Sequence, residues 1–197
     1  LALLDINEEW AASNQRYTTH PLTRAFANTK LQEEQLFAEQ ARIRWSSYYV
    51  KFVERNIIRE KPTETYWNVL TNRGYKELDL EWLNLGNVLA WVDKNNDQDR
   101  ILIELALLLA HYMNRRLLYF ERIYYAQRAA KVAAKLQMKK DEALFRIDAL
   151  GWVFIEEGRF TDAKREITAG LNIAKDMLTE STDAIDAIDL IALAHAF

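Results

Sequence analysis

The stretch Asp148-Ala-Leu-Gly-Trp-Val-Phe154 decides the fold of this 197-residue chain. Its Leu-Gly-x-x-Phe pattern returns 43 residues later as Leu-Ala-x-x-Phe at 193–197, and a related Leu-Ala-x-x-Met pattern stands 41 residues earlier at 109–113. At the same spacing of 41, Ala126, Ala129 and Ala133 align with Ile167, Gly170 and Ala174. Such self-similarity predicts stacked helical repeats, because one unit alone cannot bury its apolar face. A plain helical bundle with chance similarity is the alternative.

The composition is that of a helical protein with short connections. Half of the residues are apolar, 28% are charged, and there are only five Gly and two Pro, which excludes a disordered chain. The absence of Cys removes disulfides and thiolate chemistry, and it favours an intracellular, cytoplasmic protein. The longest strongly apolar run, Ile101–Ala110, is too short to cross a bilayer, and Leu1–Asp5 lacks the features of a signal peptide. We therefore expect no membrane partner, and the missing initial Met predicts a piece of a longer protein.

Apolar spacing predicts helices along most of the chain after Pro21, which suits the first turn of a helix. Residues 15–20 before it alternate like a strand. From Leu22 to about Arg59 the pattern predicts one long helix, or two with a break near 28–30. Further helices are expected at 64–72 (closed by Gly74), 76–94, 99–115, 119–136, 141–157 and 161–178, and another opens at Thr182. Because the later connections have only three to six residues, the expected fold is all-α, with antiparallel helical hairpins preceded by a long helix.

The order Leu150-Gly151, Gly158 and Ala163 resembles the tetratricopeptide repeat, in a form longer than the usual 34 residues. The resemblance implies that residues 96–197 stack as a right-handed superhelix and that the first helix of each hairpin lines a concave groove for a protein or peptide. Aligning Gly151 with that family assigns to the groove Glu104, His111, Asn114, Arg115, Phe145, Asp148, Trp152, Glu156 and His195. His111, Trp152 and His195 fall at equivalent positions and are expected to form a ladder across the groove. Packing of Trp152 between hairpins is the alternative.

Two other segments resemble parts of the STAND signal-transduction ATPases of the NB-ARC or NACHT type. Arg16-Tyr-Thr-Thr-His20-Pro-Leu-Thr-Arg24, with Leu1-Ala-Leu-Leu before it, is similar to the end of their winged-helix domain. The segment from Glu81-Trp-Leu-Asn84 to Trp91 is similar to the region that joins the ATPase core to C-terminal repeats in bacterial members. The resemblance implies that residues 1–29 end a winged-helix domain, that 30–95 form a connecting helical region, and that 96–197 are repeats with the last one incomplete.

His20 carries the sharpest implication of that resemblance. In the family, a His at this place reaches the β-phosphate of ADP, so His20 is implied to bind ADP in a longer parent, next to the parent's own nucleotide-binding core. Pro21 stands here where the family usually has Asp. The phosphate loop G-x-x-x-x-G-K-[ST] is absent from this chain, so we expect no cofactor in the chain itself and ADP or ATP only in the parent. Capping of the following helix by His20 is the alternative.

A basic stripe runs from Arg115 to Lys140, where eight Lys or Arg accompany a single acidic residue, Glu121. The segment from Asp141 onward reverses this balance, with twelve acidic and five basic residues. A solvent-exposed face is the simpler interpretation, and pairing between subunits is the alternative. Nucleic acid is an improbable partner, because the net charge is −3 and no aromatic residues are interleaved with the charges on the stripe's helical face.

Catalytic and metal-binding patterns are lacking. The three His are far apart and form no H-x-x-x-H or H-E-x-x-H arrangement, so no metal site is expected. No Ser stands in a nucleophile-elbow motif. The sequence therefore predicts a non-enzymatic binding module that serves as the sensor or regulatory arm of a larger bacterial STAND-type ATPase. A stand-alone adaptor that binds a partner peptide and a regulatory module of a transcription activator are the alternatives.

Overall fold

The computed structural model describes residues 4–7, 16–57, 72–180 and 184–197. The chain divides into two compact units, Leu1–Trp45 and Ser46–Phe197, and each is described by itself. Apart from one hairpin of short strands, the described residues lie in helices and turns, so the predicted all-α class is confirmed. The division falls inside the predicted connecting region 30–95, and the domain limits inferred from the sequence stay predictions.

The first unit contains a strand hairpin and a helix that follows it directly. Strand β1 (Leu4–Asn7) pairs antiparallel with β2 (Arg16–Thr19), and Leu4 lies opposite Thr19. Helix α1 (Pro21–Glu33) begins right after His20, with Pro21 in its first turn. Helix α2 (Gln35–Asn56) starts after a break at Glu34 and continues into the second unit. The two-helix alternative is thus confirmed, although the break comes later than the predicted position near 28–30.

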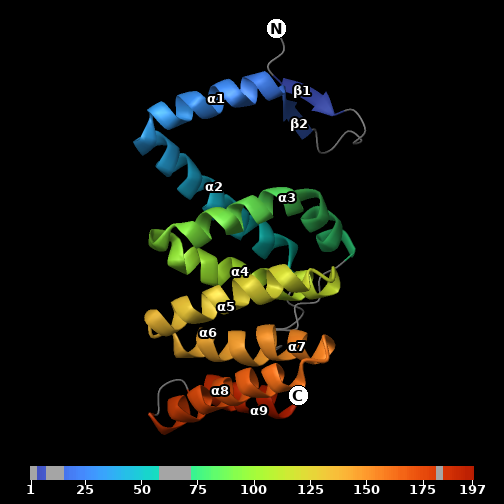
Figure 1. Cartoon of the computed structure of the whole chain (residues 1–197), viewed down its shortest axis with the longest axis vertical. Coiled ribbons are helices and arrows are strands. Elements are labelled where there is room, and N and C mark those ends of the chain that lie inside the picture. Colours follow the sequence, from blue (N-terminus) through green and yellow to red (C-terminus); the bar gives the residue numbers. More distant parts are fainter. Residues whose placement is uncertain (1–3, 8–15, 58–71, 181–183) are drawn as a thin grey trace. The chain divides into compact units, whose positions relative to one another are not determined.

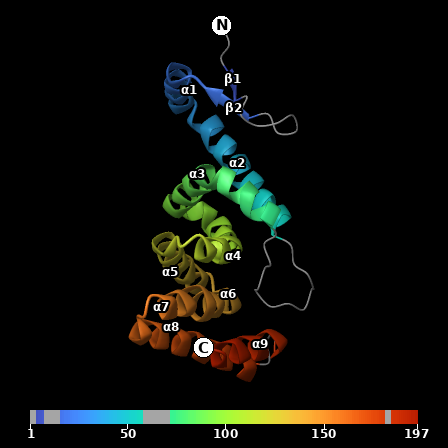
Figure 2. The same cartoon turned by 90° about the vertical axis from the view of Figure 1, so that its right-hand side faces the viewer.

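In the second unit the helices follow one another in space in the order of the sequence (Figures 1 and 2). They are α3 (Asn72–Lys94), the short 3₁₀ helix η1 (Asn96–Gln98), α4 (Asp99–Arg115), α5 (Tyr119–Lys135), α6 (Lys139–Leu144), the π-helical η2 (Phe145–Trp152), α7 (Val153–Glu156), α8 (Phe160–Thr179) and α9 (Ala184–His195). The elements α6, η2 and α7 are contiguous, so together they form the predicted helix at 141–157.

Two sequence expectations concern the segment around the start of α3 and the segment before α9. Gly74 was expected to cap a helix at 64–72, but it lies in the first turn of α3, so that prediction is wrong. Most of the 64–72 helix lies outside the described residues, as does Thr182. A Gly can follow the end of one helix or lie in the first turn of the next. The sequence around Gly74 does not distinguish these two positions.

The three turns between α4 and α8 share one geometry. Leu117, Gln137 and Gly158 each have positive φ (57°, 58° and 71°) and lie two residues after the last residue of a helix. In each turn the following residue donates its N–H to a carbonyl five positions back, as Leu118 does to Met113 at 2.9 Å. This is the Schellman arrangement, which satisfies the last carbonyls of a helix and reverses the chain sharply. The same turn thus recurs at intervals of 20 and 21 residues, and each time it brings the next helix back along the one before it.

The hairpins pack through small residues at points of close approach. A Cβ added to Gly151 on η2 would meet Cγ1 of Ile167 on α8 at 2.5 Å, and a Cβ on Gly170 would meet Cγ1 of Ile147 at 2.6 Å. The two glycines thus let η2 and α8 approach each other reciprocally. Beyond them a core cluster joins α6, η2, α8 and α9 and consists of Ala143, Leu144, Ile147, Ala174, Met177, Ala187, Leu190 and Ala194.

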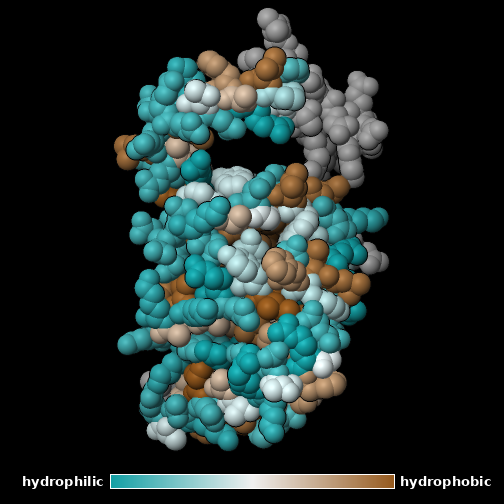
Figure 3. All heavy atoms as spheres, viewed as in Figure 1, coloured by the Kyte–Doolittle hydropathy of each residue, from teal (hydrophilic) through white to brown (hydrophobic). Residues whose placement is uncertain are grey.

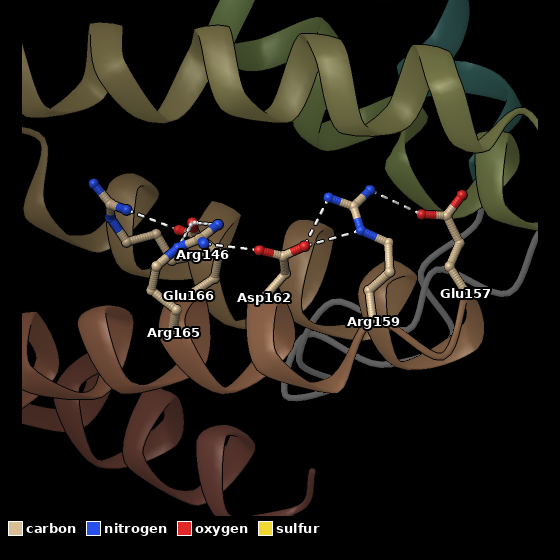
Figure 4. A network of polar contacts seen from close by, with 6 residues as sticks. All are labelled: Arg146, Glu157, Arg159, Asp162, Arg165 and Glu166. Carbon is tan, nitrogen blue, oxygen red and sulfur yellow. Dashed lines mark hydrogen bonds and ion pairs between the residues drawn. The ribbon is translucent and has the colours of Figure 1, made fainter.

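A polar network covers the same helix pair on its outer side (Figure 4). Arg146 bonds Glu166 at 2.9 Å and thereby links η2 to α8. Arg165 contacts both Glu166 and Asp162, and Arg159 extends the chain of contacts from Asp162 to Glu157. Because several of these side chains are half exposed, each pair contributes only about 0–1 kcal/mol. The network therefore helps to align the two helices, while most of the stabilisation comes from the buried contacts.

Candidate functional site

A row of three rings runs from α4 over η2 to the residue that follows α9. The ring of His111 on α4 lies 6.3 Å from that of Trp152 on η2, measured between centroids and tilted by 47°. Trp152 lies 6.2 Å from Phe197, which follows α9. The predicted contact between the positions of His111 and Trp152 is thus present. The third member of the row is Phe197, whereas the predicted member His195 is exposed at the end of α9.

Next to these rings, the ends of two equivalent helices are joined by polar side chains. Asn114 at the end of α4 donates its amide N–H to Oε1 of Glu156 at the end of α7, at 3.2 Å. Asn114 itself is only 6% exposed, and its Oδ1 is buried without a hydrogen-bond partner among the described residues. An acceptor left in that state costs about 1–3 kcal/mol. We name the set His111, Asn114, Asp148, Trp152 and Glu156 the Trp152 cluster.

A buried arginine from the second helix of the hairpin supports this cluster. Arg122 on α5 is 2% exposed. Its Nε donates to the carbonyl of Ala149 at 2.8 Å, and its two terminal nitrogens donate to the carbonyls of Asp148 (2.9 Å) and Ala110 (3.2 Å). Its guanidinium carbon lies 5.6 Å from the centroid of the Trp152 ring. Arg122 therefore bonds both α4 and η2 and fixes the part of η2 that carries Trp152.

The π-helical geometry of η2 explains how an arginine can bind there. In a π-helix each N–H bonds the carbonyl five residues back, which widens the turn and is common at functional sites. Two carbonyls of this segment, those of Asp148 and Ala149, accept additional bonds from Arg122. The charge of Arg122 is also balanced over a longer range by the carboxylates of Asp148 and Glu156. Burial nevertheless lowers the pKa of Arg122, since the charged form is removed from water.

Burial shifts the pKa values of Asp148 and His111 in opposite directions, and each shift favours the neutral form of the side chain. It raises the pKa of Asp148 above its usual range, and the nearby Arg122 offsets this only in part. It lowers the pKa of His111, and the positive charges of Arg115 and Arg122 lower it further. His111 is therefore neutral at physiological pH, when its imidazole has one donor and one acceptor nitrogen.

The remaining residues assigned to the groove are placed as follows. Glu104 and Arg115 are exposed on α4, and burial together with Glu54 raises the pKa of Glu104. Phe145 is fully buried at 0% exposure, so its assignment to a binding surface is wrong. Its position on the wider η2 turns it into the core, an effect that a regular 3.6-residue spacing does not predict.

The alternative interpretation of His20 is confirmed. Its Nδ1 accepts the N–H of Leu22 at 3.2 Å, so His20 caps α1. A phosphate contact by His20 in a longer parent stays a prediction.

Sequence reasoning missed Arg122 and Phe197. Arg122 was counted as one charge of the basic stripe, yet it precedes Ala126, Ala129 and Ala133 at intervals of four, three and four residues. That spacing places it on the buried face of α5, which is the signal that could have identified it. Phe197 was used only to recognise the repeat. Its contact with Trp152 depends on how α9 packs, and no local pattern indicates this.

The basic stripe is paired largely within the chain. Five of its eight cations form ion pairs with acids of neighbouring helices, at 2.6–3.3 Å: Arg116–Asp79, Arg128–Asp93, Lys135–Asp99, Lys139–Glu180 and Lys140–Asp186. A sixth is the buried Arg122. The stripe is therefore a set of contacts between helices, and pairing between subunits is not needed to explain its complementary charges.

Other surfaces offer less to a ligand. A cavity of about 730 Å³ lies at the turn from α5 to α6, but Lys139 and Glu180 in its wall bind each other. Within the described ranges, no group of three or more His, Cys, Asp or Glu converges as a metal site. In the same part of the chain no helix is long and apolar enough to span a bilayer. The face drawn in Figure 3 is mainly hydrophilic over the second unit, with apolar groups in small areas.

The raised pKa of Asp148 predicts a pH-dependent change in stability. The folded chain binds this proton more tightly than the unfolded chain, so the carboxylate destabilises the fold at neutral pH, and this cost disappears as pH falls through the folded pKa. We expect Asp148→Asn to melt at a higher temperature than the parent at pH 7.5, with the difference closing toward about pH 4. Thermal unfolding of both proteins across this range checks the result. A lower melting temperature for Asp148→Asn at pH 7.5 would instead mean that the attraction between Asp148 and Arg122 outweighs burial.

Comparison with known proteins finds one class of relative for this helical chain. It is 35% identical over 191 residues to the transcription activator GutR of Bacillus subtilis (strain 168). The similarity covers 97% of this chain and 22% of GutR, so the chain spans about a fifth of the length of that relative. No family model matches the chain, and no solved structure matches it significantly.

Proposed function

We propose that this chain is a ligand-sensing repeat segment of a larger transcription activator in the bacterial cytoplasm. The observation that carries the proposal is the similarity to GutR along almost the whole chain. The Trp152 cluster supplies the candidate sensor site, because it joins rings and polar atoms of α4 to those of the contiguous η2 and α7, and Phe197 contacts its Trp152 ring. A ligand at such a place changes the packing of the hairpins and can favour one of two states of the parent.

The finer part of the proposal is that the parent is a STAND-type switch and that residues 96–197 act as a tetratricopeptide-like arm. The arrangement of β2, His20 and α1 supports it, since a strand leads directly to a His at a helix start, as the resemblance to that family requires. His20 retains Nε2 for a phosphate of ADP held in the parent's core. The chain itself is proposed to have no catalytic activity and no cofactor of its own.

Transcript measurements on the full reading frame that contains the chain test this function. A strain with the intact frame is compared with a deletion strain and with a Trp152→Ala strain in which the protein level is unchanged. We expect the levels of a defined set of transcripts to fall in the deletion strain. In the Trp152→Ala strain the levels of the same transcripts should be at least about fivefold lower than in the intact strain, which is the lower end of typical couplings between sites. Transcripts that are identical in intact and deletion strains would reject the activator role. A frame without a P-loop upstream of Leu1 would reject the STAND part and favour a stand-alone adaptor.

A further inference from the structure

The Trp152 cluster offers more unsatisfied hydrogen-bond acceptors than donors. Within the described ranges, the carboxylate of Asp148 accepts no hydrogen bond from a side chain or from the backbone. Glu156 is exposed and accepts one bond, from Asn114. The Oδ1 of Asn114 is itself an acceptor without a donor, in a side chain that is more than nine-tenths buried. Buried acceptors without a donor are rare in folded proteins. A hydrogen-bond donor of a bound molecule would explain this one.

Two of the three guanidinium groups around the cluster already have their donors occupied. Arg122 is buried and already donates to three backbone carbonyls. Arg116 binds Asp79 through two hydrogen bonds, at 2.8 and 2.6 Å. Arg115 is exposed and acts on Tyr75, whose pKa its charge lowers against the effect of burial. An anionic ligand would therefore meet two carboxylates and no unoccupied buried guanidinium, which makes it the wrong sign for this place.

The rings add a second requirement for the ligand. Trp152 is partly exposed and lies between His111 and Phe197 in the row of rings. The face of an indole attracts a cation, and a planar guanidinium can also stack on it. The contact of Arg122 with the same ring, at 5.6 Å, shows that this indole already accepts one guanidinium. A flat organic cation can stack on an indole face and donate hydrogen bonds to carboxylates. The cluster contains both kinds of group.

We propose that the Trp152 cluster binds a ligand through a guanidinium or alkylammonium group. The carboxylates of Asp148 and Glu156 supply the charge, Oδ1 of Asn114 accepts an N–H, and Trp152 packs against the cation. This assignment rests on the proposed function, because it names the chemical class that the sensor site takes. Because Oδ1 of Asn114 is covered by its neighbours, binding includes a shift of the side chains over it, and such a shift transmits the occupancy of the site to the hairpins.

Isothermal titration of the full chain with agmatine tests the proposal. N-acetylcitrulline amide, in which the amine is acetylated, serves as the uncharged comparison, and an acetylated, amidated pentapeptide with one central Arg as the peptide arm. We expect saturable binding of agmatine, none of N-acetylcitrulline amide, and about a tenfold loss of affinity in Asp148→Asn, since a charged hydrogen-bond partner is removed. The matched control is Asp176→Asn, an exposed acid on α8 outside the cluster, which should bind like the parent. Tighter binding of the pentapeptide than of agmatine would identify a peptide as the source of the cation, and the reverse a free small molecule.

Two results would overturn this inference. One is the absence of saturable binding for both cations, and the other is equal affinity in the parent and in Asp148→Asn. If the transcripts depend on Trp152 while neither cation binds, the proposed function stands and the ligand class is wrong. If agmatine binds with the expected variant pattern while the transcripts do not change, the ligand class stands and the activator role falls.

Discussion

Replacing Arg122 with Met is expected to lower the free energy of unfolding by about 3 kcal/mol. The substitution removes the three hydrogen bonds that the guanidinium donates to the carbonyls of Ala110, Asp148 and Ala149, and a hydrogen bond to a charged group contributes about 1.5–3 kcal/mol. Release of a buried charge offsets part of this sum, so the net loss is smaller than three separate bonds would suggest. Urea denaturation followed by circular dichroism measures it.

The matched control for Arg122→Met is Arg128→Met on the same helix. Arg128 binds Asp93 at 2.6 Å, but its side chain is 40% exposed, so its loss should cost no more than about 1 kcal/mol. An Arg122→Met protein as stable as the parent would show that burial of the charge costs as much as its three bonds contribute. Tryptophan fluorescence provides a second readout, because Arg122 also contacts the ring of Trp152.

Gly170→Ala is expected to destabilise the chain by about 1–3 kcal/mol, the range of overpacked cores. The new Cβ would lie 2.6 Å from Cγ1 of Ile147 and 3.0 Å from the carbonyl oxygen of Ala143. The isoleucine can turn aside, whereas the carbonyl belongs to the facing helix, so α8 has to move away from it. The same urea denaturation measures the change.

Gly86→Ala is the control for this prediction. Gly86 lies inside α3, and a Cβ there has no neighbour within 4 Å. It should therefore stabilise the chain by about 0.5–1 kcal/mol, because Ala loses less backbone freedom in a helix. The two Gly→Ala changes are thus expected to have opposite signs. A stabilising Gly170→Ala would contradict the close approach of η2 and α8.

Much of the second unit could be predicted from sequence because its signals are local. The limits of α4 agree with those expected from apolar spacing, and those of α5 and α8 agree within one residue. The equivalence of His111 and Trp152 also followed from the repeat, and their rings are in contact. In these cases each helix carries its own periodic apolar face, and the short turns leave an antiparallel arrangement as the only option.

The candidate site was predicted less completely, for reasons that lie between helices. Phe145 was assigned to the binding surface because a regular helix was assumed, but the π-helical turn rotates it into the core. Arg122 was taken for a surface charge, since a residue type alone indicates exposure for Arg. Its burial depends on carbonyls supplied by α4 and η2, which are 12 to 27 residues away in the chain.

The amino-acid sequence by itself determined the helices, their hairpin order and the positions that repeat. These properties depend on neighbours within a few residues, and periodic apolar and small residues specify them. Only the tertiary structure decided which charges are buried, where Phe197 lies and that no described residue donates to Oδ1 of Asn114. Each of these groups contacts residues of another hairpin. Such contacts depend on how the helices pack, and a pattern within one helix does not indicate them.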